Sequence, residues 1–411
     1  MKKTVEDIDV RGLRVLVRLD LNVPLDDTRR ITDDRRIREA LPTIQRLIQG
    51  GSRLVLMSHL GRPEGGPNDK VNYSLAPIAK QLSELLSKNV RMAGDCVGPT
   101  ISPLVNSLND GDVCLLENLR FHDEETIADK KAKTDPALRD RKYAFARQLA
   151  SLADVYVNDA FGTCHRDNAS MLTVPQLMSG KPRVVGYLIQ KELRFLGEAV
   201  KNPARPFVVL LGGAKVSDKL GVIRALLSKC DKVLVGGAMA YTFLAAEGVQ
   251  VGKSLCEPDL FGVAKELRSF AGSRLLLPVD SIAATEIKKG AEAMTYDASI
   301  PANHMGLDIG PKTVADYSGE LAKARTIVWN GPMGVFETPP FDRGTMAMAK
   351  AVAEATDRGA TTIVGGGDSA AAIDAAGLAH RISHISTGGG ASLEFLEGKS
   401  FDALDVLDDA P

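Results

Sequence analysis

The stretch FVVLLGGAK, residues 207–215, is a short apolar run that stops abruptly at two glycines. Four more runs in the second half of the chain end in the same way: KVLVGGAM (232–239), TIVWNGPMG (326–334), TTIVGGGD (361–368) and HISTGGG (384–390). Short apolar, often β-branched runs that stop at turn residues indicate buried strands. Glycine at such a point lets the backbone approach a ligand closely and offer its N–H groups to phosphate.

Apolar runs in the first half end in polar or charged residues instead: VRLDLN (17–22), LVLMSHLGR (54–62), VCLLENLRFH (113–122) and VYVNDAFGTCHR (155–166). Open parallel α/β sheets bind ligands outside the carboxyl ends of their strands. The first half therefore offers Arg and His side chains to an anion, while the second half offers backbone N–H groups to phosphates. Two phosphorylated ligands on one chain suggest phosphoryl transfer.

Segments of helical period lie between these runs, for example 74–88 and 217–229, where Ser217 or Asp218 is expected as the N-cap. This alternation predicts an α/β fold with two Rossmann-like, doubly wound parallel-sheet domains. The amphipathic segment YLIQKELRFLGEAV (187–200) separates the two rounds, and we interpret it as an interdomain hinge helix. An ordinary helix of one core is the alternative.

The predicted boundaries place the first domain at residues 1–180, with the C-terminal tail 394–411 added to it. The second domain covers 186–393 and begins with the hinge helix. A chain of 411 residues suits two domains.

Composition excludes several classes of protein. With 51 basic and 52 acidic residues, the chain has no overall attraction to nucleic acid or to a membrane surface. No apolar stretch reaches the roughly 18–20 residues needed to span a bilayer, and the N-terminus does not read as a signal peptide. The five cysteines form no CxxC pair, so we expect reduced thiols and a cytoplasmic protein.

A basic set accompanies the strand ends of the first half. An arginine presents a planar fork of donors that matches phosphate or carboxylate, although a single surface arginine usually makes an ion pair worth under about 1 kcal/mol. Their shared position favours an anion site over scattered ion pairs. Arg36 precedes Pro42, so we expect it at a turn or at the start of a kinked helix. The set consists of Asp20, Asn22, Arg36, His59, Arg62, Arg120, His165 and Arg166.

The glycine-rich half contains a second candidate site. Lys215 and Lys219 fall near the first turn of a predicted helix, where they oppose the helix dipole unless an anion such as a nucleotide phosphate lies close by. Asp368 follows the GGG turn, where a carboxylate could hold Mg²⁺. Single glycine pairs are weak signals, because tight packing of helix on strand also requires them. No GxGxxG follows the first strand of either half, which argues against a dinucleotide-dependent dehydrogenase.

Taken together, these motifs resemble the phosphoglycerate kinase family. They occur in order over about residues 14–398: VRLDLNVP, SHLGRP, ENLRF, DAFGTCHR, LGGAKVSDK, LDIGPKT, WNGPMGVFE, GGGDS and STGGGASLEFLEG. The resemblance implies a phosphotransferase with a carboxyl group as acceptor. It would transfer a phosphoryl group reversibly from 1,3-bisphosphoglycerate to MgADP, giving 3-phosphoglycerate and MgATP in glycolysis and gluconeogenesis. It also implies a monomer that needs Mg²⁺ and has no nucleic-acid or membrane partner.

The resemblance also implies site residues. The expected 3-phosphoglycerate site is Asp20, Asn22, Arg36, His59, Leu60, Gly61, Arg62, Arg120 and Arg166. The expected nucleotide site is Gly213, Lys219, Asn330, Glu337, Gly366, Gly367, Asp368 and Ser369, with Asp368 on the metal. Catalytic roles fall to Arg36, Lys215, Gly366 and Gly389. Segment 286–306, around the expected adenine pocket, matches less closely, and the C-terminal tail is expected to fold back onto the first domain.

None of these residues is a plausible nucleophile, so we expect direct in-line transfer without a phosphoenzyme, after hinge closure has excluded water. Two alternatives remain. One is another two-domain kinase that acts on a phosphorylated acid. The other is a nucleotide-sensing or scaffold protein that kept the fold without the chemistry, although the presence of Arg36, Lys215 and Asp368 argues against it.

Overall fold

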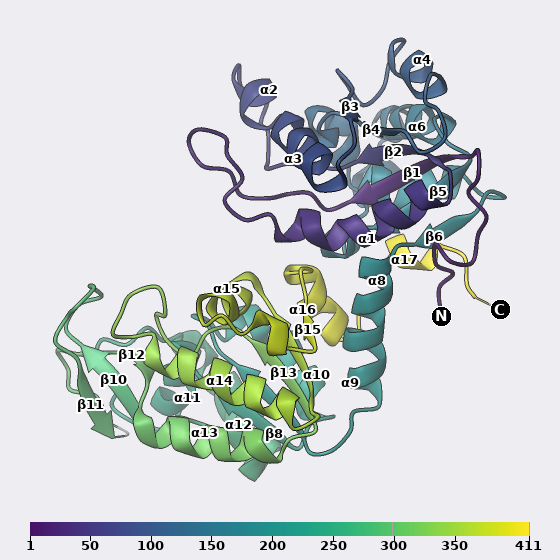
Figure 1. Cartoon of the computed structure of the whole chain (residues 1–411). Coiled ribbons are helices and arrows are strands. Elements are labelled where there is room, and N and C mark those ends of the chain that lie inside the picture. Colours follow the sequence, from purple (N-terminus) through teal and green to yellow (C-terminus); the bar gives the residue numbers. More distant parts are fainter. Residues whose placement is uncertain (298, 411) are drawn as a thin grey trace. The chain divides into compact units, whose positions relative to one another are not determined.

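A computed structural model describes residues 1–297 and 299–410. The chain divides into two compact units, one of residues 1–193 together with the C-terminal segment from Ser400, the other of residues 194–399. Each unit contains a six-stranded parallel sheet with helices between its strands (Figure 1). The predicted fold class, with two parallel-sheet α/β units, is confirmed.

The sheet of the first unit has the strand order β3-β4-β2-β1-β5-β6. Its strands are β1 (Arg14–Leu19), β2 (Arg53–Met57), β3 (Val90–Met92), β4 (Val113–Leu115), β5 (Val155–Asp159) and β6 (Arg183–Val185). The helices are α1 (Arg35–Gln49), α2 (Asp69–Asn72), α3 (Ala76–Leu86), α4 (Ile101–Asn106), α5 (Asp129–Thr134), α6 (Pro136–Ser151), α7 (Val174–Leu177), α8 (Tyr187–Glu192) and α17 (Asp402–Asp405).

Alternate residues of β1 face opposite sides of this sheet, as the two-residue period of a strand requires. Val15 and Val17 join a buried apolar cluster with Ile37 and Ile44 of α1 and Ile78 of α3, so these two helices cover one face. The parallel sheet is buried on both faces, which explains why its strands appear in the sequence as near-continuous apolar runs.

The second unit repeats this plan with the order β15-β14-β13-β7-β8-β9. Its parallel strands are β7 (Phe207–Leu211), β8 (Lys232–Val235), β9 (Leu275–Leu276), β13 (Thr326–Asn330), β14 (Thr361–Gly365) and β15 (His384–Ile385). The helices are α9 (Ala199–Lys201), α10 (Leu220–Leu227), α11 (Met239–Ala246), α12 (Phe261–Ala271), α13 (Pro311–Lys323), α14 (Arg343–Asp357), α15 (Gly367–Ala375) and α16 (Gly390–Leu396). Helices α13 and α14 lie side by side (Figure 1) and pack into the cluster around Trp329.

A second, antiparallel sheet in this unit was not predicted. It consists of β10 (Asp280–Ala284), β11 (Met294–Asp297) and β12 (Met305–Ile309) in the order β11-β10-β12. Its edge strand β11 is mostly exposed, so it lacks the apolar run by which a strand is recognised in sequence. The strand falls in the segment 286–306, where the motif match was weakest.

Carboxylates from elsewhere in the chain bind the first backbone N–H groups of several helices in this unit. Asp280 accepts from Lys312 and Thr313 of α13, at 2.9 and 2.8 Å. Asp308 accepts from Gly344 of α14 at 2.6 Å. These contacts satisfy N–H groups that have no partner within the helix.

The predicted N-cap of segment 217–229 is wrong. Ser217–Lys219 form a 3₁₀ turn before α10, and no side-chain cap comes from Ser217 or Asp218. Glu257, far along the chain, accepts instead from the backbone of Val216 and Ser217, at 2.6 and 3.1 Å. A tertiary contact of this kind leaves no local signal in the sequence.

The segment between the two sheets is helical, as expected. It consists of α8, a π-helical stretch Leu193–Glu198 and α9. The division between the units falls inside it, at residue 193, rather than in the loop before it. The C-terminal part of the first unit starts at Ser400 rather than at 394. In this C-terminal segment Asp408 forms an ion pair with Arg183 at 2.9 Å, and the ring centroid of Phe401 lies 6.3 Å from that of Phe161. Helix α16, which precedes the segment, belongs to the second unit.

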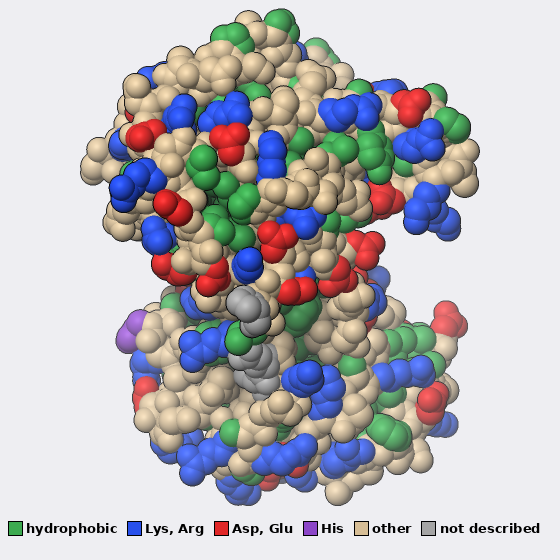
Figure 2. Space-filling view, turned by 90° about the vertical axis from the view of Figure 1, so that its right-hand side faces the viewer, with side chains coloured by type: hydrophobic (Ala, Val, Ile, Leu, Met, Phe, Trp, Pro, Cys, Tyr) green, Lys and Arg blue, Asp and Glu red, His purple; other side chains and the backbone are tan. Residues whose placement is uncertain are grey.

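Acidic and basic side chains are both scattered over the face shown in Figure 2, in keeping with the net charge of −1. Among the described residues, none of the helices combines the length and the apolarity that a membrane span requires.

Candidate active site

The first candidate site lies where β1 and β2 end. These strands pair in parallel, so the residues that follow them leave the same edge of the sheet. The Ser58 hydroxyl ties the two ends together: it accepts from the Leu21 N–H at 2.9 Å and donates to the Leu19 carbonyl at 2.9 Å. Asp20 and His59 are thereby held next to each other.

Arg36 is the second residue of α1 and forms an ion pair with the buried carboxylate of Asp20. The helix continues through Pro42, so the expected position of Arg36 at a helix start is confirmed. Burial alone would raise the pKa of Asp20, but the charges of Arg36 and Arg18 outweigh it and lower that pKa. The carboxylate therefore stays ionised and keeps the Arg36 side chain at the strand ends.

His59 is almost completely buried, and its ring Nδ1 lies 3.1 Å from Nη2 of Arg18. Burial, followed by the charge of Arg18, lowers the pKa of His59 well below its ordinary value. A guanidinium has donors only, so Nδ1 must accept and the neutral ring carries its proton on Nε2. His59 can thus donate a neutral hydrogen bond to an anionic ligand.

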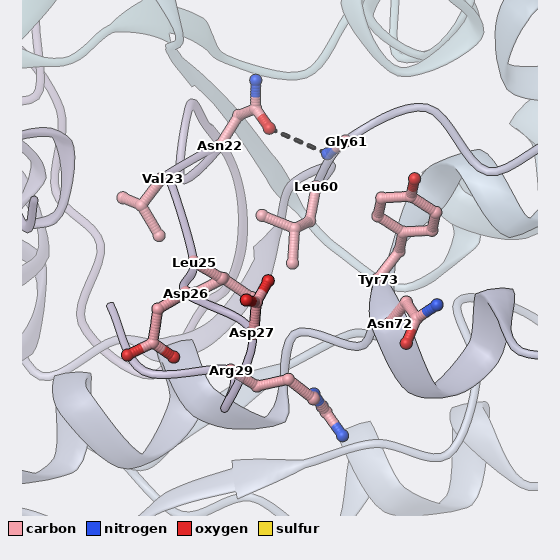
Figure 3. A pocket seen from close by; sticks show the side chains of 10 residues that line it. All are labelled: Asn22, Val23, Leu25, Asp26, Asp27, Arg29, Leu60, Gly61, Asn72 and Tyr73. Carbon is pink, nitrogen blue, oxygen red and sulfur yellow. Dashed lines mark hydrogen bonds between the residues drawn. The ribbon is translucent and has the colours of Figure 1, made fainter. Parts of the chain in front are cut away.

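Gly61 connects two further members of the predicted set. Its N–H donates to the Asn22 side chain at 2.8 Å, and its carbonyl accepts from Arg120 at 2.6 Å. Gly61 has a φ of +59°, and an added Cβ would meet the Tyr73 ring at 2.4 Å, so a larger residue does not fit. Figure 3 shows Asn22, Leu60 and Gly61 on the wall of a pocket of about 480 Å³ beside Tyr73.

Positive charge gathers around Arg120. Burial, and then the charges of Arg166 and Arg18, lower the pKa of Arg120 to about 10, and Arg62 acts in the same direction. Its Nε atom is buried and has no hydrogen-bond partner among the described residues. Guanidinium groups that repel one another and have unused donors provide a binding site for an anion that carries more than one charge.

Not every predicted member lies at the centre of this group. Arg62 and Arg166 are exposed, and Arg166 donates to His165 at 3.3 Å. The His165 ring lies 6.5 Å from Phe401 of the C-terminal segment.

Two residues that the sequence analysis did not single out hold this site together. Arg18 is fully buried and donates to Ser170 at 2.9 Å as well as to His59. Asn118 accepts from the backbone of Leu60 at 3.2 Å and of Arg120 at 3.0 Å. A charged residue inside an otherwise apolar strand is a signal that could have identified Arg18.

The second candidate site lies at the carboxyl edge of the other sheet. Asn330, the last residue of β13, pairs with Leu211 of β7 on one side and with Gly365 of β14 on the other. It therefore lies between the glycine loops that follow β7 and β14. An added Cβ on Gly366 would approach the Asn330 amide to 3.1 Å. The Ser369 hydroxyl accepts from the Gly331 N–H at 2.6 Å and joins the loops after β13 and β14.

Lys219 extends into the same place. Its Nζ donates to the Asn330 backbone carbonyl at 3.0 Å and also to the Asn330 side chain. Burial lowers the pKa of Lys219 to about 8, against the opposing charges of Asp368 and Asp218. An added Cβ on Gly213 would lie 3.6 Å from Nζ of Lys219, which places the first glycine loop against the same ammonium group.

Helix α15 starts differently from α13 and α14. Its N-cap is Gly366 at φ +92°, and within the described part of the chain no carboxylate or other side chain binds its first N–H groups. Asp368 lies in the first turn with an exposed side chain, and its charge reaches Lys219. Free N–H groups and the positive end of a nine-residue helix suit a phosphate. An exposed carboxylate beside them fits Mg²⁺, which is usually bound by one or two carboxylates plus substrate phosphates.

Three predicted residues remain apart from these contacts. Lys215 is exposed and acts electrostatically on Glu257. Glu337 is exposed in the loop after β13. Gly389 is the N-cap of the short helix α16, with φ +54°.

Two units, each with a parallel sheet and a candidate anion site at its carboxyl edge, define the class: a two-domain α/β protein with one candidate anion site in each domain. The phosphoglycerate kinase family model matches residues 5–399. Two proteins called phosphoglycerate kinase, from Rhodopirellula baltica and Chlorobium phaeobacteroides, are each 53% identical to the chain over 412 residues. The first match covers 100% of both chains, and the second covers 99% of this chain and 100% of the relative.

Solved structures agree. The phosphoglycerate kinase of Coxiella burnetii has a TM-score of 0.84 at 39% identity, covering 99% of this chain and 98% of that one. The enzyme of Pyrococcus horikoshii has a TM-score of 0.83 at 33% identity, covering 98% of both. This chain belongs to the phosphoglycerate kinase family and is a phosphotransferase of the kinase class.

Proposed function

We propose that the protein transfers a phosphoryl group reversibly from 1,3-bisphosphoglycerate to MgADP, giving 3-phosphoglycerate and MgATP in glycolysis and gluconeogenesis. The observation that carries this proposal is the group of guanidiniums around Arg120: burial, and then repulsion by Arg166 and Arg18, lower the Arg120 pKa to about 10. Such a group binds a ligand with both a carboxylate and a phosphate better than one with a single charge. Family membership supplies the choice among such ligands.

The acid substrate would bind to the first unit. Arg120 has an unused buried donor, His59 offers Nε2–H, and Arg36 has donors beyond those that contact Asp20. The rest of the proposed substrate site is Asn22, Leu60, Gly61, Arg62 and Arg166.

The nucleotide would bind to the second unit, with its phosphates on the free N–H groups of α15 and on Lys219. The Asp368 carboxylate would hold Mg²⁺ together with phosphate oxygens, and the ion would supply neutralising charge. Asn330 and Ser369 support the glycine loops. Gly213, Glu337, Gly366 and Gly367 complete the proposed nucleotide site.

The chemical step would be a direct displacement. A β-phosphate oxygen of ADP attacks the phosphorus, the bond from phosphorus to the acyl oxygen breaks, and the carboxylate leaves with the electron pair. Arg36, Lys215 and the N–H groups at Gly366 and Gly389 would surround the transferring group. Positioning and charge stabilisation account for most of the catalysis in phosphoryl transfer.

Closure about the helix α8–α9 would bring the two ligands together, with the two compact units, divided at residue 193 and at Ser400, as the proposed moving parts. Each candidate site is built from one unit's own residues, so neither ligand alone would complete the catalytic arrangement.

The proposed compartment is the cytoplasm, since all five cysteines are free. The proposed oligomeric state is a monomer, without nucleic-acid or membrane partners. Size-exclusion chromatography with light scattering measures the mass.

A coupled assay for ATP formation tests the function. Purified protein, ADP and Mg²⁺ are supplied with 1,3-bisphosphoglycerate, or with acetyl phosphate as a simpler acyl phosphate. We expect ATP formation with 1,3-bisphosphoglycerate and none with acetyl phosphate. Equal activity with both would favour a less selective kinase, and nucleotide binding without any turnover would favour a sensing or scaffold role.

A further inference from the structure

The carboxyl ends of β3 and β4 bring together three side chains that the proposed reaction does not use. The strands are parallel neighbours, with Met92 paired to Leu115. Asp95 and Cys96 follow β3, and His122 follows β4 after the 3₁₀ turn Leu119–Phe121. One possible ligand atom from each of the three lies within 4.8 Å of the other two.

Two of these three side chains are partly exposed to solvent. His122 Nε2 lies 2.5 Å from Asp95 Oδ1, and these two side chains are 25% and 48% exposed. Cys96 is buried, and its thiol donates to the Glu117 carbonyl at 2.8 Å. The His122 ring stacks on Phe145, with 5.1 Å between the ring centroids. Two of the three possible ligand groups are therefore accessible from solvent, and the third is buried.

Charge around the sulfur favours a cation. Burial, and then the carboxylates of Asp95, Glu125 and Glu117, raise the pKa of the Cys96 thiol, and the same negative charges attract a cation to the sulfur. Glu117 is already bound by Ser74 and by the Leu75 N–H, at 2.8 Å each, so it would serve as a neighbouring charge rather than as a ligand.

We propose that Asp95, Cys96 and His122 form a binding site for a divalent cation that accepts mixed sulfur, nitrogen and oxygen ligands, with Zn²⁺ as the probe. Zinc bonds of about 2.0–2.3 Å at tetrahedral angles require ligand atoms about 3–4 Å apart, so small rotations of His122 and Asp95 would suffice. Three protein ligands leave a fourth position for water. Binding displaces the thiol proton of Cys96 to solvent. Mg²⁺ would not compete, because it prefers oxygen ligands in octahedral geometry.

Equilibrium dialysis of the full chain with Zn²⁺, in excess Mg²⁺, tests the proposal. One equivalent should bind to the wild type. Cys96→Ser and His122→Gln should each weaken binding at least tenfold, while the control Cys256→Ser, which removes a partly exposed thiol of the second unit, should leave it unchanged. Loss of binding on Cys256→Ser, or unchanged binding in both cluster variants, overturns the proposal.

A measurement on the wild type alone covers the case in which Cys96→Ser does not fold. Co²⁺ bound by a thiolate gives a charge-transfer absorption in the near ultraviolet and strong visible bands when tetrahedral. We expect both, with the charge-transfer band lost on addition of one equivalent of Zn²⁺. Co²⁺ binding without that band would mean that Cys96 is not a ligand and would also overturn the proposal.

Discussion

At the scale of single residues, the Asp20–Arg36 ion pair shows how the Arg36 side chain can be ordered before a ligand binds. Asp20 is buried and ionised beside Arg36. A guanidinium has five N–H donors, so one carboxylate does not use all of them. Arg36 is held in position by Asp20 and keeps donors for the phosphoryl group that we propose as its ligand.

Arg36→Ala should therefore remove most of the turnover while substrate binding and fold persist. One contact to charge that develops in the transition state contributes about 3–4 kcal/mol, so kcat should fall by roughly 10²–10³-fold. Steady-state kinetics measure the change. Arg38→Ala is the matched control, because Arg38 is exposed on the same helix and pairs with Asp34. A kcat of Arg36→Ala within a few-fold of wild type would refute the role proposed for Arg36.

Asp368→Asn should weaken the binding of MgADP and change the binding of metal-free ADP much less. A carboxylate that binds Mg²⁺ through the nucleotide contributes only when the ion is present. Isothermal titration calorimetry, with Mg²⁺ and with a chelator, measures both affinities. Equal losses under the two conditions would make Asp368 a structural residue at the start of α15.

At the scale of elements, a carboxylate bound to the first N–H groups of a helix distinguishes helices with occupied N-termini from those whose N-termini could bind a ligand. Asp280 and Asp308 bind the first N–H groups of α13 and α14, whereas no side chain among residues 1–297 and 299–410 binds those of α15. Where a carboxylate of the chain itself already accepts from the first N–H groups of a helix, those groups cannot bind an anionic ligand. The uncapped α15 is therefore the better candidate for phosphate.

Asp159 shows the energetic cost of such a carboxylate when it is fully buried. It follows β5, accepts from Ile189 of α8 at 3.1 Å, and has one oxygen without a partner. Burial raises its pKa from 3.8 to about 7, against hydrogen bonds from Thr43, Ile189 and Leu188. The folded state thus favours the protonated Asp159 carboxyl. The stability that this preference adds to the fold is fully present below pH 3.8 and is lost as the pH rises through about 7.

The free energy of unfolding of Asp159→Asn, taken relative to that of wild type, should consequently increase by a few kcal/mol from pH 5 to pH 7.5. Each unit by which the Asp159 pKa is raised corresponds to about 1.4 kcal/mol. Urea unfolding followed by circular dichroism at the two pH values measures the difference. Asp154→Asn is the control: this half-exposed carboxylate pairs with Arg14, which lowers its pKa, so its effect should not change over this range. A constant difference for Asp159→Asn would show that the carboxyl titrates normally.

At the scale of the whole molecule, the chain builds two similar units and places a different chemistry on each. The first unit presents side-chain cations around Arg120, and the second presents backbone N–H groups beside Lys219. Each ligand can shift an open–closed equilibrium only by its differential affinity for the two states.

The radius of gyration should therefore fall clearly when 3-phosphoglycerate and MgADP are both bound, and less with either alone. Small-angle X-ray scattering on the same sample with no ligand, one ligand and both provides the comparison. No change with both ligands would mean that closure is not part of the mechanism.

The sequence by itself determined the fold class and most of the proposed site. Parallel strands are buried on both faces, so they appear as apolar runs, and the residue after each run marks the ligand edge. The order of the motifs was enough to indicate the family. Those signals are local, because each depends on residues close together in the chain.

Only the tertiary structure decided the contacts between residues far apart in the chain. It joined Arg18 to His59 and Glu257 to the start of the 217–229 segment, and it formed the antiparallel sheet from an exposed edge strand. It also brought Asp95 and Cys96 to His122. Each of these depends on which strands become neighbours. That choice is made by packing the whole core, because burial of apolar area rewards the complete arrangement rather than any one segment.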